Sequence, residues 1–350
     1  MLKKRVIIRV TVLLAVLAIF ASCTRLKIYL DQSGIEEIAD SILSDFKTDS
    51  QQELTDYLSS YDYRQADNVE FPPEIKREPL KDWALKGDLT MERISFPSTI
   101  KKRNGENDIA HFYLYRKSNL SPQKAILWIP GFGVSDFAFR FIKEFFYAEL
   151  EAGYAILFYN IPHHLNRIEE GYEMGQGLFT ASHIGNLELI RHVCFEINTA
   201  LDFLKKEDYQ SISGWGGSIG AAFLWLSSNS FAYDHLTLMI PIVDWNSLIF
   251  HPAMAGVVKS MVQSGLSEQL IRKTYEKVNP YTISSLTDPQ NIQILYGLYD
   301  QFTPESKILN FARKWGITNT HGYNESHASI LINDQMYRDY AQFLSDQNQR

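Results

Sequence analysis

The chain has 350 residues, of which 45% are hydrophobic and 13% aromatic, enough apolar material to build a substantial core in one large domain or two ordinary ones. The formal net charge is −7, and no block of Lys or Arg occurs beyond the first few residues. Binding of nucleic acid requires a basic surface, so the composition excludes that class of partner and predicts a globular chain.

The first 22 residues have the organisation of a signal peptide. A basic cluster at residues 3–5 precedes an apolar stretch at residues 10–21, which is shorter than the ~20 apolar residues of a membrane-spanning helix. The sequence "FASC" then resembles the lipobox of bacterial lipoproteins, in which the cysteine, here Cys23, becomes the lipidated first residue. Phe20 departs from the usual aliphatic residue and leaves an uncleaved N-terminal anchor as the alternative. Both interpretations predict a membrane-tethered protein of the bacterial cell envelope, facing the periplasm or the exterior.

Residues 23–90 are expected to form one or two helices and a linker. The stretch "GIEEIADSILSDF" is acidic and amphipathic, and "EFPPEIKREPL" contains prolines typical of a connection. With Cys23 lipidated, Cys194 is the only thiol left, which excludes an intramolecular disulfide. Cys194 falls on the apolar stripe of a predicted helix and is expected to be a buried core residue.

Residues 91–350 are expected to form the main domain. The segments "MERISFPSTI" and "IAHFYLYRK" predict an antiparallel pair of strands around a turn at Asn104-Gly105. Short apolar runs follow, each before a segment with helical periodicity: "KAILWIPG", "YAILFYNIP", "SISGWG", "LTLMIPIVD" and "NIQILYGLYD". This alternation predicts a mostly parallel sheet between helical layers, which is a three-layer α/β sandwich. Residues 245–288 predict an insertion of several short helices, suited to a lid or a substrate pocket.

A glycine-rich stretch, "GGSIG" at residues 216–220, lies where a predicted strand gives way to a predicted helix. It matches G-x-S-x-G, the nucleophile elbow, in which a strained turn exposes the serine and the residues two positions away must be small. Phosphate binding is the alternative, but Ile219 stands where the dinucleotide pattern needs its third glycine, and no Gly-Lys-Ser/Thr follows. Ser218 is therefore the candidate nucleophile.

A nucleophilic serine requires a general base and a group that orients this base, and on such a fold the order along the chain is Ser, acid, His. Asp300 follows the run "NIQILYGLY", and His327 follows the last predicted strand, so they are the candidate acid and base. Asp244 ends the preceding predicted strand and remains an alternative acid, because only geometry matters to the triad. His321 is expected to be a packed residue within its strand.

Two backbone N–H groups are needed to bind the oxyanion that develops on a carbonyl substrate. The N–H of Ile219, directly after the nucleophile, is one candidate, and the N–H of Phe132 in "WIPGFGVSD" is the other.

His163 and His164 suggest a metal pair, but adjacent side chains on an extended chain point in opposite directions and no ligand cluster accompanies them. We expect both to be loop residues, with at most one lining the pocket, and we expect no metal site.

From about Met91 to the C-terminus, the elbow, the acid, the histidine and the strand pattern together resemble the alpha/beta-hydrolase superfamily. The sequence "PGFG" departs from the superfamily's frequent His-Gly start through Pro130, which removes no oxyanion donor if Phe132 supplies it. The stretches "IPHHLNR" and "EGYEMGQGLFTAS" look like a subgroup with a Pro-His-Leu-x-Arg signature, which implies no substrate. The resemblance implies a hydrolase that works without a cofactor.

The sequence thus predicts an exported, membrane-tethered serine hydrolase, a carboxylesterase or lipase-like enzyme that acts on a small-molecule or lipid ester. A peptidase or an acyltransferase would use the same residues, and a non-catalytic binding protein on the same scaffold is the competing class. Aromatic residues expected near the site favour an apolar acyl group, although they could equally fill the core: Phe132, Phe137, Tyr159, Phe179, Trp245 and Phe250.

Overall fold

The structure, a computed structural model, describes residues 24–65, 74–80, 88–98, 105–118, 122–133 and 136–349. The predicted signal peptide and Cys23 lie outside these residues. The helices are α2 (Thr24–Ser44), α3 (Gln51–Ser60), α4 (Asp136–Glu151), α5 (His183–Lys206), α6 (Ile219–Ser227), α7 (Trp245–Ile249), α8 (Ala255–Gln263), α9 (Glu268–Thr274), α10 (Glu305–Trp315) and α11 (Asp334–Asn348). The strands are β1 (Lys76–Leu80), β2 (Leu89–Pro97), β3 (Ile109–Lys117), β4 (Lys124–Ile129), β5 (Tyr154–Asn160), β6 (Ser211–Gly217), β7 (Leu236–Met239), β8 (Ile292–Gly297) and β9 (Asn319–Tyr323).

The described strands form one nine-stranded sheet in the order β1-β2-β3-β5-β4-β6-β7-β8-β9. The pairs from β1 to β5 are antiparallel, and every neighbouring pair from β5 to β9 is parallel. The predicted antiparallel pair is β2 with β3, whose register sets Met91 opposite Tyr115. Its turn residue Asn104 lies outside the described residues. The prediction of a mostly parallel three-layer α/β sandwich is confirmed.

The edge strand β1 lies in the segment for which the sequence predicts only a linker. Its sequence, KREPL, is charged and contains a proline, a composition that disfavours a strand unless it lies at an edge. Cross-strand ion pairs join Arg77 to Glu92, at 2.6 Å, and Arg93 to Glu78. The structure therefore extends the sheet into the expected linker, and pairing with β2 supplies what the local sequence lacks.

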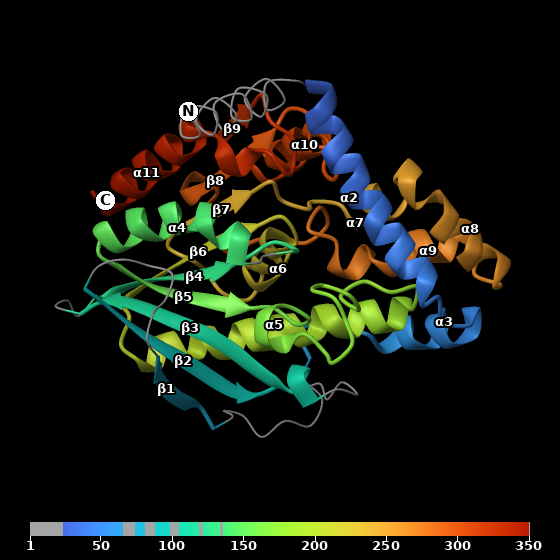
Figure 1. Cartoon of the computed structure of the whole chain (residues 1–350), viewed down its shortest axis with the longest axis horizontal. Coiled ribbons are helices and arrows are strands. Elements are labelled where there is room, and N and C mark those ends of the chain that lie inside the picture. The colour runs from blue at the N-terminus through green and yellow to red at the C-terminus, as the bar shows by residue number, and fades with distance from the viewer. Residues whose placement is uncertain are drawn as a thin grey trace, which may run out of the picture.

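Helices cover both faces of the sheet (Figure 1). On one face α4 and α11 bury an aromatic cluster, in which the rings of Trp128 and Trp215 stack with centroids 3.6 Å apart. On the other face α5, α6 and α10 pack over the apolar side chains of the central strands. Cys194 on α5 is buried in this second cluster, as predicted.

The predicted insertion consists of the short helices α7, α8 and α9 with single 3₁₀ turns between and after them. The N-terminal helix α2 runs past α10 and these insertion helices down to α3 (Figure 1). Its residues Ile35 and Ile42 pack with Met254 and Met261 of the insertion in a third apolar cluster. None of the helices that the structure describes combines the length and apolar character needed to cross a membrane.

Candidate active site

The candidate nucleophile Ser218 lies in the tight turn between β6 and α6. Its backbone has φ 53° and ψ −119°, a conformation that non-glycine residues rarely adopt and that costs about 1–3 kcal/mol. A Cβ at Gly220 would lie 2.3 Å from the carbonyl oxygens of Ile129 and Pro130, and a Cβ at Gly216 would lie 2.6 Å from the Cα of Ala221. Only glycine fits at these two positions, so the local sequence accounts for the strained turn.

A chain of hydrogen bonds joins Ser218 to His327 and Asp300. The hydroxyl oxygen of Ser218 lies 2.7 Å from Nε2 of His327, and Nδ1 of His327 lies 2.7 Å from Oδ2 of Asp300. The carboxylate can only accept, so Nδ1 carries the proton and Nε2 is left to accept from the serine. The loops that follow β8 and β9 carry Asp300 and His327, so the three residues meet at the carboxyl edge of the parallel strands.

The acid is buried and the histidine is partly buried, with side chains 0% and 11% exposed. Burial disfavours the charged imidazole, but the Asp300 carboxylate, its hydrogen bond and the charge of Asp31 outweigh that effect and raise the pKa of His327 above its ordinary value. The other oxygen of Asp300 accepts the backbone N–H groups of Phe302, at 2.8 Å, and Thr303, at 2.9 Å. Asp300 is therefore fixed in orientation as well as in position.

The alternative acid, Asp244, lies apart from the histidine. It caps α7 by accepting the N–H of Asn246 at 3.1 Å, and it pairs with Lys307 at 3.1 Å. His321 lies within β9, as expected, but its side chain is 38% exposed rather than packed; it hydrogen-bonds to Asn319 at 2.7 Å and lies 3.6 Å from Asp339. The geometry therefore joins Asp300 and His327, and not Asp244 or His321, to Ser218.

The loop after β4 brings Phe132 to the site. Its side chain, 41% exposed, lines the same pocket as Ser218. The next residue, Gly133, donates its N–H to Nε2 of His164 at 2.9 Å, and Nδ1 of His164 lies 2.9 Å from the carbonyl oxygen of Pro162. Burial lowers the pKa of His164 to about 4, which keeps Nε2 free to accept. Ile219 is the first residue of α6, where backbone N–H groups have no partner within the helix.

The segment that holds His164 is itself anchored in the core. Arg167 is fully buried and forms two charge-assisted bonds to Glu196 on α5, at 2.7 and 2.9 Å. His163 and His164 lie in the loop after β5, as expected, and both are buried there. His164 supports the loop of Phe132, and His163 lies 3.4 Å from Glu169.

Within the described ranges no group of three or more His, Cys, Asp or Glu side chains could hold a metal ion.

Asp31, on the N-terminal helix α2, is a site residue that the sequence did not reveal. It is 1% exposed, and its carboxylate accepts three backbone N–H groups, from Gln301, His327 and Ala328, at 3.1, 2.8 and 3.0 Å. The one available signal was its position, because Asp31 lies on the buried stripe of the helix together with Ile35 and Ile42. An acidic residue on such a stripe requires a partner.

The pocket around Ser218 has a volume of about 290 Å³ and mainly apolar walls. The described residues that line it include two ionisable side chains, Asp31 and His327. The walls come from α2, from the loop after β4, from the ends of β4, β6 and β7, and from the loops that carry Asp300 and His327. The apolar residues of these walls include Leu30, Phe132, Met239, Ile240, Phe302 and Leu331. The site therefore suits an uncharged, apolar group.

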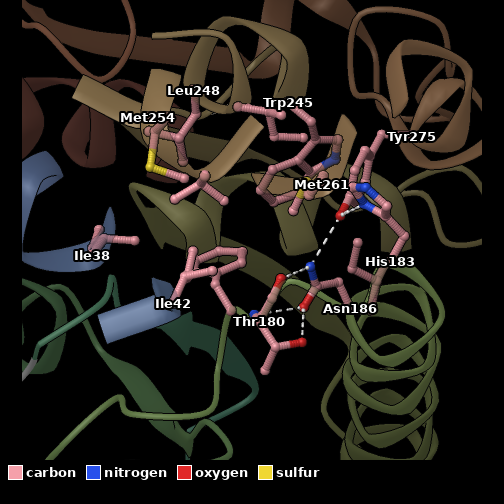
Figure 2. Close-up of a pocket in the computed structure, with 14 residues that line it drawn as sticks. Ile38, Ile42, Thr180, His183, Asn186, Trp245, Leu248, Met254, Met261 and Tyr275 are labelled. Atoms are coloured by element: carbon pink, nitrogen blue, oxygen red, sulfur yellow. Dashed lines mark hydrogen bonds between the residues drawn. The ribbon is translucent and has the colours of Figure 1, made fainter. Parts of the chain in front are cut away.

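A second pocket, of about 50 Å³, lies between α2, the insertion and the start of α5 (Figure 2). Phe179 and Trp245 line this pocket and not the one around Ser218. Tyr159 donates its hydroxyl to Glu196, and Phe250 lies under the guanidinium of Arg272. Of the predicted aromatics whose side chains are described, Phe132 alone lines the pocket of Ser218; the side chain of Phe137 lies outside the described set.

Comparison with known proteins identifies the fold. No family model matches the sequence, and no curated protein is similar to it in sequence. Among solved structures, a cold-adapted esterase from an Arctic intertidal metagenomic library matches at a TM-score of 0.51 and 12% identity, over 77% of this chain and 97% of that chain. An S-formylglutathione hydrolase from Agrobacterium tumefaciens matches at 0.51 and 11%, over 77% and 98%. A protein from Agrobacterium vitis S4 matches at 0.52 and 12%, over 73% and 98%.

Proposed function

Because the chain has the fold of the alpha/beta-hydrolase superfamily, we propose that it is a serine hydrolase, and specifically a carboxylesterase that acts through an acyl-Ser218 intermediate. The observation that carries this proposal is the hydrogen-bonded chain of Ser218, His327 and Asp300 beside an apolar pocket. A fold of this kind hosts many functions, so the argument rests on the site and not on the structural relatives.

In the proposed reaction, Nε2 of His327 takes the proton of Ser218 as the serine oxygen bonds to the ester carbonyl carbon. Asp300 stabilises the imidazolium, and the N–H groups of Phe132 and Ile219 bind the oxyanion, each contributing about 3–4 kcal/mol to the transition state. The alcohol leaves with the proton from His327. Water then adds to the acyl-enzyme with His327 again as the base, and release of the carboxylic acid restores Ser218.

The pocket favours an ester with an uncharged, apolar acyl group. Its walls are mainly apolar, and two large apolar side chains at its edge, Leu30 and Phe132, are 47% and 41% exposed. Exposed apolar residues at a pocket are typical of a surface that meets lipid or another apolar partner. We therefore include esters of membrane lipids, as in a lipase-like enzyme, among the proposed substrates.

The proposal also places the enzyme at the cell envelope. Cys23, the residue expected to carry lipid, lies seven positions before Leu30, which α2 supplies to the wall of the pocket. A lipid anchor at Cys23 would hold that wall close to a bilayer surface. Export and tethering therefore agree with an apolar ester as substrate, and both remain part of the proposal.

Labelling with a fluorophosphonate probe tests the chemistry. The probe should modify the folded wild-type protein and fail to modify Ser218→Ala, because it reacts with an activated serine. Ser247→Ala is the matched control, since Ser247 lies outside the pocket and hydrogen-bonds to Asp244 at 2.9 Å; it should be labelled like the wild type. Folded wild-type protein that resists the probe would contradict the hydrolase and favour the binding protein. A series of simple esters of increasing acyl length would then define the substrate.

A further inference from the structure

We propose that Asp31 positions the acid and the histidine of the active site by joining the two loops that carry them. This inference rests on the proposed function of Ser218, His327 and Asp300, and it assigns to the N-terminal helix α2 a part in the reaction. Asp31 is a positioning residue, because its carboxylate bonds to the backbone of the histidine and of the residue after the acid.

The contacts of Asp31 divide between the two loops. Its Oδ2 atom accepts the N–H of Gln301, which follows Asp300, at 3.1 Å, and the N–H of His327 at 2.8 Å. Its Oδ1 atom accepts the N–H of Ala328 at 3.0 Å. A single carboxylate therefore links the loop after β8 to the loop after β9. The distance between the acid and the imidazole depends on the relative position of these same two loops.

Two neighbours of Asp31 on the same face of α2 reinforce this arrangement. Lys27, one turn earlier, is 7% exposed and pairs with Glu325 at 2.7 Å, two residues before the histidine. Gly34, one turn later, packs against the ring of Phe302, from which a Cβ at this position would lie 3.4 Å away. The Phe302 ring in turn stacks on the imidazole of His327 with centroids 4.4 Å apart. The spacing of 27, 31 and 34 follows one side of a helix.

The negative charge of Asp31 acts on His327 in addition to the positioning of the two loops. The described charged groups that face His327 are Asp300, from the loop after β8, and Asp31, from α2, while Lys27 and Glu325 pair with each other. The charge of Asp31 favours the imidazolium that forms as the serine loses its proton, and it contributes to the raised pKa of His327.

The decisive variant is Asp31→Asn, which keeps the shape of the side chain and removes its charge. The amide also turns an NH₂ group toward a backbone N–H, so at least one of the three hydrogen bonds is lost. We expect kcat to fall about 10- to 100-fold, as is typical when reacting groups are slightly misplaced. We also expect the pKa of His327 to fall, since one of the two anions that favour its charged form is gone. The acidic limb of the pH–rate profile then moves to lower pH.

Two further variants separate positioning from simple docking. Lys27→Met removes the other buried contact of the same helix face with the histidine loop, and should lower stability without moving the pKa of His327. Asp31→Glu retains the charge but displaces it; it should keep the pKa of His327 raised while still lowering kcat. Because Asp31→Glu preserves the anion, it also provides the test if Asp31→Asn fails to fold: a kcat equal to wild type would then overturn the proposal.

The pKa of His327 can be measured without any substrate, by NMR titration of full-length protein carrying ¹⁵N-labelled histidine, with the signal assigned by its loss in His327→Gln. An unchanged pKa in folded Asp31→Asn would overturn the proposal, and so would a fall of equal size in Lys27→Met. A lowered pKa in Asp31→Asn, together with a wild-type protein that resists the fluorophosphonate, would support the role of Asp31 and contradict only the proposed hydrolase.

Discussion

The contact between His327 and Asp300 favours Asp300 as the acid of the proposed reaction, because the competing carboxylate of Asp244 caps a helix and pairs with Lys307 instead. We expect Asp300→Asn to lower kcat by about 10⁴-fold, since the amide cannot hold the imidazole in the tautomer that accepts the serine proton. Asp244→Asn should change kcat little and cost about 1 kcal/mol of stability through the weakened cap. Hydrolysis of a simple ester by both variants is the measurement, and the opposite ranking of the two variants would show that Asp244 is the acid.

The protonation state of His327 sets the pH dependence. The imidazole must be neutral to accept the proton of Ser218, and its pKa lies above the ordinary value. Activity should therefore fall on acidification, with half-maximal kcat/KM at a pH above the ordinary histidine value of ~6.5. A pH–rate profile of the wild-type protein tests this expectation. A profile that stays flat from mildly acidic to neutral pH would count against His327 as the base.

The sequence predicted Ser218, Asp300 and His327 as candidates because each follows from a local pattern: a five-residue motif, or a position just after an apolar strand. Asp31 has no such pattern. Its partners lie 270 to 297 residues away, and only the packing of α2 against the two loops brings them together. The role of His164 was missed for a related reason, since its hydrogen bond to Gly133 depends on how a folded loop directs one ring nitrogen.

At the scale of elements, the segment of residues 162–167 supports the loop after β4. His163 and Leu165 both have positive φ, 61° and 47°, and the segment keeps this strained course because Arg167 anchors it to α5. The helix-forming and strand-forming patterns predicted the sheet except for β1, but they did not predict this segment, whose course depends on a buried ion pair.

Replacing His164 should misplace the loop of Phe132. In His164→Phe the ring remains, but the N–H of Gly133 loses its acceptor, and we expect kcat to fall at least about tenfold with a smaller change in KM, because the oxyanion forms after substrate binding. The pH midpoint should stay unchanged, since the pKa of His164, about 4, lies below the assay range. His321→Phe, on the half-exposed surface of β9, is the control. Unaltered kinetics in His164→Phe would remove the loop from the mechanism.

The anchor of the same segment can be tested by stability alone. Arg167→Met leaves the fully buried carboxylate of Glu196 without its main partner, and we expect the free energy of unfolding to fall by about 3–5 kcal/mol. The double variant Arg167→Met with Glu196→Leu should recover part of that loss, because no unpaired charge remains in the core. Urea denaturation of the two variants measures both effects. If the double variant is less stable than the single one, the ion pair contributes through something other than charge compensation.

At the scale of the whole molecule, helix α2 connects the N-terminal segment to the active site. It lines the pocket with Leu30 and bonds to the histidine loop through Asp31. The sequence predicted one or two helices and a linker here but not what they contact, because amphipathic periodicity indicates that a face is buried without indicating what covers it. The structure adds that the covering surface includes the loops of Asp300 and His327.

The predicted anchor is tested at Cys23. Signal-peptide cleavage before this residue would leave a diacylated N-terminus, and two chains give stable membrane attachment where one gives only marginal binding, at ~0.8 kcal/mol per buried CH₂. Cys23→Ser should therefore abolish incorporation of a labelled fatty acid and change the mobility of the mature protein on a gel. Cys194→Ala is the control, because that thiol is buried in the core and should leave labelling unchanged. If Cys23→Ser behaves like the wild type in both respects, lipidation is wrong, and the uncleaved N-terminal anchor becomes the account of how α2 and the active site reach the membrane.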